Sequence, residues 1–536
     1  MSTPAVPPSS TPPSRSLWSP LSIKTFRWLW LATLVSNIGG WMHDAGAGWL
    51  ITELTDSAVI VALMQTATSL PAFFILLPSG ALSDIFDRRL YLMVANIGRA
   101  VVALILAILT LTGVITAWSL LGLTLLLGIG MAMVMPTWQS IIPETVPRSQ
   151  LQNAIGLNTL GMNMSRVIGA LIAGEILRRT GSGAVFACNA ISFIFIIVVL
   201  WRWKRVPEPV TLPPEKFTPA IATGLRFAWH SPALKSTIYR SVGFYFFSSV
   251  MWALLPLIAR DLLEGDSTTF SNLYAAISTG AIISGFMQPR LRKWLNTDQL
   301  LTAAAVVFGI GISLTALVPV HSLALLTLAV CGAAWITVMT CSQMSAQTAL
   351  PHWVRSRGIA IFQMFFMGSL AIGPVVWGSV TELTSIRTAL LTAAVGVVVA
   401  TLYTRRWPVS GNDKLDHTPS QHWQKPDLQI AVEPDQGPVM ITVRYHVEPA
   451  KLAEFTQEMQ LLGTARRRDG ATFWQLFEDA QNPGQYVETY VVHSWLDHLR
   501  QHERITRNDA QTQNRIRSLV VAGTEPVVNQ YIAPRQ

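Results

Sequence analysis

Residues 80–89, Gly80-Ala-Leu-Ser-Asp84-Ile-Phe-Asp87-Arg88-Arg89, place two acids and two arginines between long apolar segments. Residues 58–82 contain no charged side chain, and residues 90–113 contain only Arg99. At about 1.5 Å per helical residue, each segment is long enough to cross about 30 Å of hydrocarbon. The stretch therefore predicts a charged hairpin between two membrane spans, an arrangement typical of transporters.

The composition indicates a chain that lies mostly in a membrane. Of 536 residues, 51% are hydrophobic and 13% are charged, whereas soluble domains carry about 25% charged residues. We expect an α-helical membrane protein with twelve spans, divided six and six. They lie at roughly 26–51, 57–82, 90–113, 116–142, 151–177, 182–203, 236–259, 268–289, 299–319, 322–347, 357–381 and 384–404.

The basic residues gather on one side of these spans. The formal charge is +9, yet most lysines and arginines fall in the termini or in even-numbered loops, including Arg88, Arg89 and Arg292. The odd-numbered loops hold only Arg178, Arg179, Arg260 and Arg387. The positive-inside rule then places both termini in the cytoplasm. The basic charge thus reports topology, and no nucleic-acid partner is expected.

The chain divides into six parts by composition. We predict a disordered tail at 1–20, six-helix halves at 21–203 and 236–407, a cytoplasmic central loop at 204–235, a linker at 408–437 and a small domain at 438–536. Residues 220–229 in the central loop have the pattern of a short amphipathic helix, suited either to the membrane surface or to packing against the bundle.

The small domain has alternating strand patterns at 439–445, 472–478, 486–492 and 526–531, with helical patterns at 450–467 and 496–520. This βαββαβ order fits a ferredoxin-like α+β sandwich. Domains of about 100 residues often gain stability by pairing sheets, so the domain is a candidate site of dimerisation.

The charged hairpin resembles a known signature. Gly80, Leu82, Asp84, Arg88 and Arg89 match the loop between spans two and three of the major facilitator superfamily, whose pattern is close to G-x-L-x-D-x-x-G-R-R. Asp87 takes the glycine position here. That departure affects the tight turn but keeps the charges, and aspartate also tolerates turn conformations.

The resemblance narrows to the transmembrane secretion effector branch, whose members include exporters of the siderophore enterobactin and a macrolide-resistance protein. Its marks are residues 84–89, Pro143-Glu144 with 151–154, Arg357-Gly358, and the tail stretches 467–471, Glu488, Ser494-Trp495 and 498–504. The tail itself resembles the antibiotic biosynthesis monooxygenase type of dimeric α/β barrel.

The superfamily resemblance implies that the hairpin is a latch between the two halves. Gly80 would let two helices approach closely, and Asp84 would face the positive N-terminus of span eleven near Arg355 and Arg357. Arg88 and Arg89 would belong to the same latch. Alternatively, the two arginines only anchor the topology.

Ionisable residues inside the spans are the first candidates for proton or substrate coupling, because such groups are costly in a membrane. Asp44 would take and release the proton, with His43 beside it. The alternative is that this pair lies near the outer interface, where water satisfies it. Arg99, Arg166 and Glu175 are further candidates, although Arg166 and Glu175 are about 13 Å apart along one helix and are not partners of each other.

Small residues form another pattern. Gly161, Gly169 and Gly174 in span five resemble the glycine-rich antiporter motif of exporters, with Gly373-Pro374 as the related element of span eleven. The alternative is close helix packing of the kind found in any membrane bundle.

Evidence for other chemistry is weak. His498 and His502 have metal-ligand spacing, with His446 and His493 as further candidates, but no matching carboxylate or cysteine accompanies them, so no metal is predicted. No nucleotide loop or cofactor fingerprint appears, so no cofactor is expected and an ion gradient, by default of protons, is the energy source.

We therefore expect a secondary exporter of a small molecule, not an enzyme. Siderophores, antibiotics and similar compounds all remain open as cargo. The competing interpretations are a catalytically active monooxygenase-like or haem-modifying tail, and an importer or sensor of the same fold.

Overall fold

The computed structural model describes residues 18–204, 217–351, 353–410, 420, 432–521 and 523–534. Within these ranges it leaves undescribed the side chains of Gly80, Ala81, Ser83, Asp84, Ile85, Arg148, Gln152, residues 217–223 and Glu503. Most of the predicted disordered tail and linker, and residues 205–216 of the predicted central loop, therefore fall outside the described residues. The chain forms two compact units. One comprises residues 1–210, 241–340 and 364–405, and the other comprises residues 211–240, 341–363 and 406–536.

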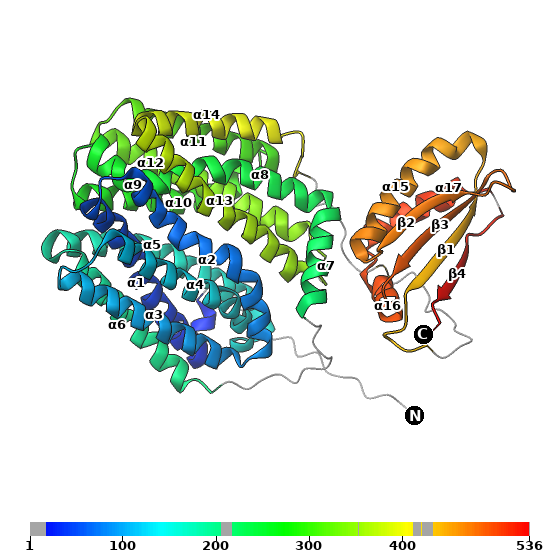
Figure 1. The fold of residues 1–536 in the computed structure, drawn as a ribbon, viewed down its shortest axis with the longest axis horizontal. Helices are drawn as coiled ribbons and strands as arrows, with labels where there is room; N and C mark the ends of the chain where they lie inside the picture. Colours follow the sequence, from blue (N-terminus) through cyan, green and yellow to red (C-terminus); the bar gives the residue numbers. More distant parts are fainter. Residues whose placement is uncertain are drawn as a thin grey trace. The chain divides into compact units, whose positions relative to one another are not determined.

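A helix covers each of the six spans predicted for the first half (Figure 1). A short 3₁₀ turn, Ser19–Ser22, precedes them. The helices are α1 (Lys24–Leu54), α2 (Ala58–Ile85), α3 (Arg88–Leu111), α4 (Ala117–Thr145), α5 (Leu151–Thr180) and α6 (Ser182–Arg202).

The second half repeats this arrangement with one interruption. Its seventh span consists of α8 (Pro232–Ser248), α9 (Val250–Leu257) and a π-helical turn at Ile258–Leu262. Pro256 lacks an amide hydrogen, which weakens regular α-helical bonding at this point. The remaining helices are α10 (Ser267–Leu291), α11 (Thr297–Leu317), α12 (His321–Thr348), α13 (Arg355–Leu383) and α14 (Ile386–Thr404).

Ten stretches among the described residues are long and apolar enough to cross a membrane. The two predicted spans that fall short are α1 and α10. Their sequences are more polar: α1 contains Lys24, Arg27, Asp44 and Glu53, and α10 is rich in serine and threonine.

The outward face of α3 shows why such a bundle suits a lipid solvent. Leu90, Val94, Val101 and Ile108 recur at helical spacing and are all exposed, whereas Asn96 on the opposite face is buried. Water would oppose an apolar stripe of this length, and hydrocarbon would not.

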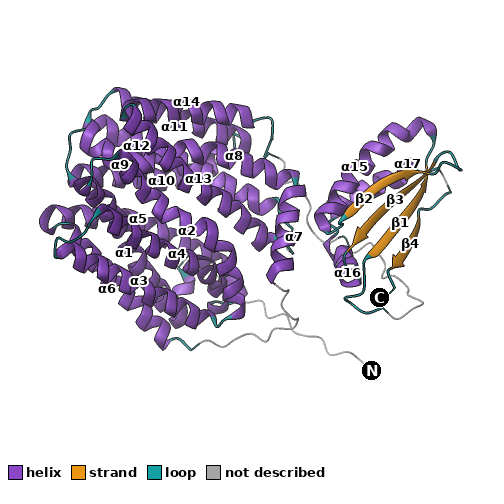
Figure 2. Cartoon of the chain, in the orientation of Figure 1, coloured by secondary structure: helices purple, strands orange, loops and turns teal. Residues whose placement is uncertain are grey.

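The second compact unit contains α7 (Phe217–His230) and the small C-terminal domain. The amphipathic helix predicted at 220–229 is thus present and slightly longer. The domain comprises β1 (Val439–His446), α15 (Leu452–Asp469), β2 (Phe473–Glu478), β3 (Gln485–Val492), α16 (Trp495–Arg504), α17 (Arg507–Leu519) and β4 (Val527–Ile532) (Figure 2).

The four strands form one antiparallel sheet in the order β2-β3-β1-β4. The strand predictions were correct within two residues at each end. The single helix predicted at 496–520 was wrong, because it breaks at Ile505 into α16 and α17. Thr506 explains the break: its side chain and that of Asp509 form a capping box that starts a new helix.

Candidate functional site

Asp44 lies within α1 and interacts electrostatically with two arginines of other helices, Arg99 of α3 and Arg166 of α5. Each guanidinium also lies over an aromatic ring: Arg99 is 4.4 Å from the ring centre of Phe193, and Arg166 is 4.3 Å from that of Trp41. Cation–π contacts of this kind hold a cation where hydration is restricted. One carboxylate between two cations is therefore the charged centre of the first half.

Several polar atoms around this centre lack protein partners. Within the described part of the chain, Nδ1 and Nε2 of His43, Nε of Arg99 and Nε of Arg166 are buried without a hydrogen bond. His43 packs against the ring of Phe186, with centroids 5.3 Å apart. Buried unsatisfied groups are rare in folded proteins and call for a water, an ion or a ligand. The cluster thus has unused capacity to bind.

Tyr274 of α10 belongs to the same electrostatic cluster, because it interacts with both Asp44 and Arg166. It was missed in the sequence, where a single tyrosine within a span carries no distinctive signal. Since α10 comes from the second six helices, the cluster involves residues of both halves.

A cavity of about 90 Å³ adjoins the cluster through Arg99. Four side-chain amides line it: Asn37, Asn96, Gln139 and Asn158. Some of them are already engaged, since Arg99 Nη1 lies 3.5 Å from Asn96 Oδ1, and Trp138 Nε1 donates to Asn158 Oδ1 over 3.1 Å. A cavity of this size that presents several side-chain amides can hold several waters. Polar residues within spans are a general signal for such a place.

Glu175 does not join the cluster. Its carboxylate is exposed near the end of α5 and pairs with Arg178 at 2.8 Å and with Arg179. The expectation that Glu175 and Arg166 are not partners agrees with this geometry.

The charged hairpin engages helices of its own half. Arg88 Nη1 lies 2.8 Å from Glu144 Oε1 of α4 and also donates to the Ser140 carbonyl over 3.3 Å. Arg89 donates to the carbonyls of Leu200 and Trp201, over 2.7 and 2.6 Å, in the last turn of α6. Such carbonyls have no partner within their own helix.

Asp87, which stands at the signature's glycine position, caps α3 by accepting a hydrogen bond from the Leu90 amide over 2.9 Å. The turn does not need a left-handed residue here, because φ of Asp87 is −59°.

The structure describes the remaining latch candidates only in part. Gly80 and Asp84 fall at the end of α2, where their surroundings lie outside the described residues. Arg355 donates to the Leu350 carbonyl over 3.4 Å, and Arg357 lies in the first turn of α13. The latch between halves stays a prediction.

The two halves meet at the end of the bundle where α1 ends and α2 begins, which we call the odd-loop end. Glu382 of α13 accepts hydrogen bonds from Ser57 Oγ at 2.7 Å and from the Val59 amide at 3.1 Å. Arg260, in the π-helical turn, donates to the Thr52 carbonyl over 2.6 Å and lies 3.6 Å from Asp56.

These contacts join the two halves at the odd-loop end. None of these residues was predicted as a site. Ser57 alone had a signal, as a capping serine before an apolar run.

The glycines of the predicted antiporter-type motif permit close helix contacts. A Cβ on Gly169 would lie 2.8 Å from the Ile38 carbonyl oxygen of α1, and one on Gly174 would lie 2.5 Å from Ser271 Cβ of α10. Gly161 faces Trp30. Gly373, followed by Pro374 within α13, has Ser249 Oγ at 2.1 Å from the same ideal position. Packing therefore accounts for these glycines, and a role in antiport stays a prediction.

The small domain contains a buried polar network around Glu488. Its carboxylate accepts hydrogen bonds from Arg466 Nε, Trp474 Nε1 and Tyr445 Oη, at 3.0, 3.0 and 3.1 Å. Glu488 is fully buried, and Arg466 also lies over the Tyr490 ring. Burial raises the pKa of Tyr490 to about 12, the nearby Arg466 opposing the shift.

The two candidate metal histidines contact each other, with 3.3 Å between the Nε2 atoms of His498 and His502. In the described part of the chain, no group of three or more His, Cys, Asp or Glu residues could hold a metal ion. Burial lowers the pKa of His498 to about 3, and the neighbouring His502 and Arg466 act in the same direction.

Comparisons with known proteins find similar transport proteins. The sequence profile described as transmembrane secretion effector matches residues 15–536. The staphyloferrin A transporter of Staphylococcus aureus is 23% identical over 51% of this chain and 69% of its own length. The multidrug efflux pump Tap of Mycolicibacterium fortuitum is 22% identical over 63% of this chain and 84% of its own length. The macrolide efflux protein A of Streptococcus pyogenes is 21% identical over 55% of this chain and 73% of its own length.

Solved structures share the fold of the helical part. A bacterial homologue of the human lysosomal transporter Spinster, inward-facing and unoccupied, superposes with a TM-score of 0.56 at 14% identity, over 74% of this chain and 98% of the homologue. The nucleoside transporter NupG superposes with a TM-score of 0.61 at 12% identity, over 72% of this chain and 99% of NupG.

Proposed function

The chain belongs to the transmembrane secretion effector family, and from that premise we propose that it exports a small molecule across the bacterial inner membrane. Its relatives include a siderophore transporter and efflux pumps for macrolides and multiple drugs. A siderophore, an antibiotic or a compound of similar chemistry is accordingly the proposed cargo. The helical part has the length and apolar character that such a transporter requires.

The single observation that carries the mechanism is the electrostatic interaction of Asp44 with both Arg99 and Arg166. A carboxylate held by two cations inside a bundle can exchange a proton when a cationic partner moves or binds an anion. Asp44 is thus the proposed proton carrier of an antiporter. His43, with both ring nitrogens unsatisfied among the described residues, is the proposed second polar group of the path.

Alternating access is the proposed cycle. The bonds from Glu382 to α2 and from Arg260 to α1 close the odd-loop end. By the distribution of basic residues, that end faces the periplasm, with both termini in the cytoplasm. The two six-helix halves would rock around the Asp44 cluster, and these bonds would break when the transporter opens outward.

The C-terminal domain is proposed to be ferredoxin-like and to pair with a second copy. Its sheet has helices on one face, and the other carries a row of apolar side chains in register: Tyr531 opposite Met440, Met440 opposite Val491, and Val491 opposite Phe473. Met440 and Phe473 are exposed, at 38% and 46%. Light scattering of the full-length protein in detergent, with and without Phe473→Asp, tests this pairing.

The export proposal is tested with oriented membrane vesicles. Inside-out vesicles with an acidic interior should accumulate a staphyloferrin-type siderophore or a macrolide, and a protonophore should abolish the accumulation. Accumulation only in right-side-out vesicles would instead make the protein an importer. If neither the parent nor the Asp44→Asn variant accumulates any of these compounds, the proposed cargo class is overturned.

A further inference from the structure

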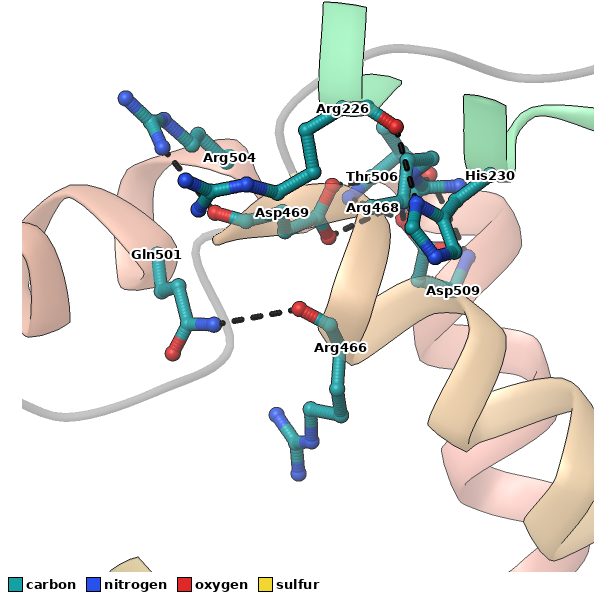
Figure 3. A network of polar contacts seen from close by, with 9 residues as sticks. All are labelled: Arg226, His230, Arg466, Arg468, Asp469, Gln501, Arg504, Thr506 and Asp509. Atoms are coloured by element: carbon teal, nitrogen blue, oxygen red, sulfur yellow. Dashed lines mark hydrogen bonds and ion pairs between the residues drawn. The ribbon is translucent and has the colours of Figure 1, made fainter. Parts of the chain in front are cut away.

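One edge of the C-terminal domain is built from arginines and aspartates that fix each other (Figure 3). At the end of α15, Arg468 Nε lies 2.8 Å from Asp469 Oδ1, and its Nη2 lies 2.8 Å from Asp509 Oδ2 at the start of α17. Arg504, the last residue of α16, donates to the Asp469 carbonyl over 3.0 Å. We call Arg468, Asp469, Gly470 and Arg504 the docking edge.

The docking edge makes three contacts with segments that precede it by more than 100 residues. Arg226 Nη1 of α7 donates to the Gly470 carbonyl over 3.0 Å. The Arg468 guanidinium lies 5.7 Å from the ring centre of Phe227, the next residue of α7. The Arg504 guanidinium lies 4.4 Å from the ring centre of Trp353, two residues before α13 begins.

The two aromatic rings form one receptor surface. Phe227 and Trp353 meet edge to face, with centroids 5.6 Å apart, so each ring accepts a cation on a face that the other leaves open. Arg226 lies beside them, and its own carbonyl is engaged by His230 Nδ1 at 3.0 Å (Figure 3). A hydrogen-bond donor and two π-faces thus meet a carbonyl and two guanidinium groups.

Burial distinguishes this contact from a loose collision of surface side chains. Phe227 is 1% exposed, Asp469 5% and Arg504 8%. Charged groups rarely remain buried unless they are paired, and here Asp469 pairs with Arg468 while Arg504 lies against the Trp353 ring. The backbone fits as well, because Gly470 has a φ of +134°, a conformation that suits glycine, and its carbonyl accepts the hydrogen bond from Arg226.

Helix α7 in turn lies against the start of α13. A Cβ on Gly224 would be 3.0 Å from Arg357 Cβ, so the two helices are close-packed there. The C-terminal domain, α7 and the first turn of α13 therefore form one packed body, in line with their membership of one compact unit.

We propose that the docking edge makes the C-terminal domain a clamp on α7 and on the start of α13. The partner of this surface is a segment of the same chain, whatever molecule is transported. Helix α13 runs from Arg355 to Leu383 and carries Glu382, which closes the odd-loop end. A domain that restrains the first turn of α13 favours the conformation in which that end is closed, since a contact made in one state shifts the population toward it.

The test uses the full-length protein in lipid nanodiscs, with Cys188, Cys331 and Cys341 replaced by serine. Spin labels at Trp229→Cys on α7 and Leu461→Cys on α15 report docking, because the native side chains are 71% and 53% exposed. The disrupting variant combines Arg226→Gln and Trp353→Leu, both outside the C-terminal domain, so the fold of that domain is preserved. The matched control is Arg444→Gln, on the exposed sheet face.

A single narrow distance distribution is expected in the parent and in the control, and a broad one in the double variant. A broad distribution in the parent, or a narrow one in the double variant, would overturn docking. A second pair, Val114→Cys and Leu383→Cys, reports the odd-loop end, where both native side chains are exposed. The clamp predicts at least a threefold rise of the longer-distance population when docking is lost, and an unchanged population would overturn it.

Discussion

Glu382 and Ser57, 325 residues apart in the chain, share a hydrogen bond of 2.7 Å that joins the end of α13 to the start of α2. The same carboxylate oxygen accepts from the Val59 amide, one of the donors that a helix N-terminus leaves unpaired. A negative charge is favourable at that position because of the helix dipole. The contact is therefore a bond between the two halves that is also a helix cap.

Replacing Glu382 with alanine should open the odd-loop end. The loss of two hydrogen bonds that join α13 to the start of α2 should shift the population away from the closed state. Spin-label distances across this end check the shift. Glu175→Ala, which removes an exposed acid paired only within α5, is the matched control and should leave the distances unchanged.

Asp44→Asn should abolish transport driven by a pH gradient. The neutral amide cannot carry a proton, and it leaves the charges of Arg99 and Arg166 without their carboxylate. The cost of an uncompensated buried charge is about 3–5 kcal/mol, so expression and insertion must be compared as well. Vesicle uptake measures the effect, with Asp435→Asn as a control outside the spans. Gradient-driven transport at the parent rate would remove Asp44 from the mechanism.

The Arg88–Glu144 pair should behave as one unit. Its side chains are only 23% and 17% exposed, so Arg88→Ala or Glu144→Ala should each lower the transport rate or the thermal stability, with a cost of about 1–2 kcal/mol. The double reversal, Arg88→Glu with Glu144→Arg, should restore part of the loss. Arg178→Ala, in the exposed pair of α5, should have little effect. Fully additive losses in the double variant would contradict the pairing.

The helices and strands could be predicted from the sequence because each depends on the pattern of apolar residues within its own segment. Apolar runs indicated all twelve helical segments, and alternation placed β1 to β4. The break at Thr506 was missed although Thr506 and Asp509 form a readable cap, because the apolar pattern continues across it. The site is different: His43, Asp44, Arg99 and Arg166 could be suspected as costly intramembrane groups, but their convergence depends on how α1, α3 and α5 pack. The Glu382–Ser57 bond depends on packing to the same degree.

Glu488→Ala should unfold the C-terminal domain at a much lower temperature than the parent. Three donors, Arg466, Trp474 and Tyr445, would lose a fully buried acceptor, and removing one partner of such a network costs about 3–5 kcal/mol. Resistance of the domain to proteolysis during a thermal ramp of the full-length protein checks this. Glu525→Ala, an exposed acid of the same domain, should change little. Similar melting of the two variants would show that the network contributes no stability.

The stability of the C-terminal domain should fall as the pH drops below about 6.5, and His498 should account for much of the fall. Its pKa is about 3 in the folded domain and has its ordinary value of 6.5 in the unfolded chain, mainly because burial opposes the charged form. Between these values the unfolded state binds the extra proton, so the free energy of unfolding decreases with falling pH, by up to about 1.4 kcal/mol per pH unit. His498→Gln should flatten this slope, whereas His493→Gln should retain it. Proteolysis midpoints of the full-length protein at pH 5, 6 and 7 make the comparison, and equal slopes in the two variants would assign the acid sensitivity to another group.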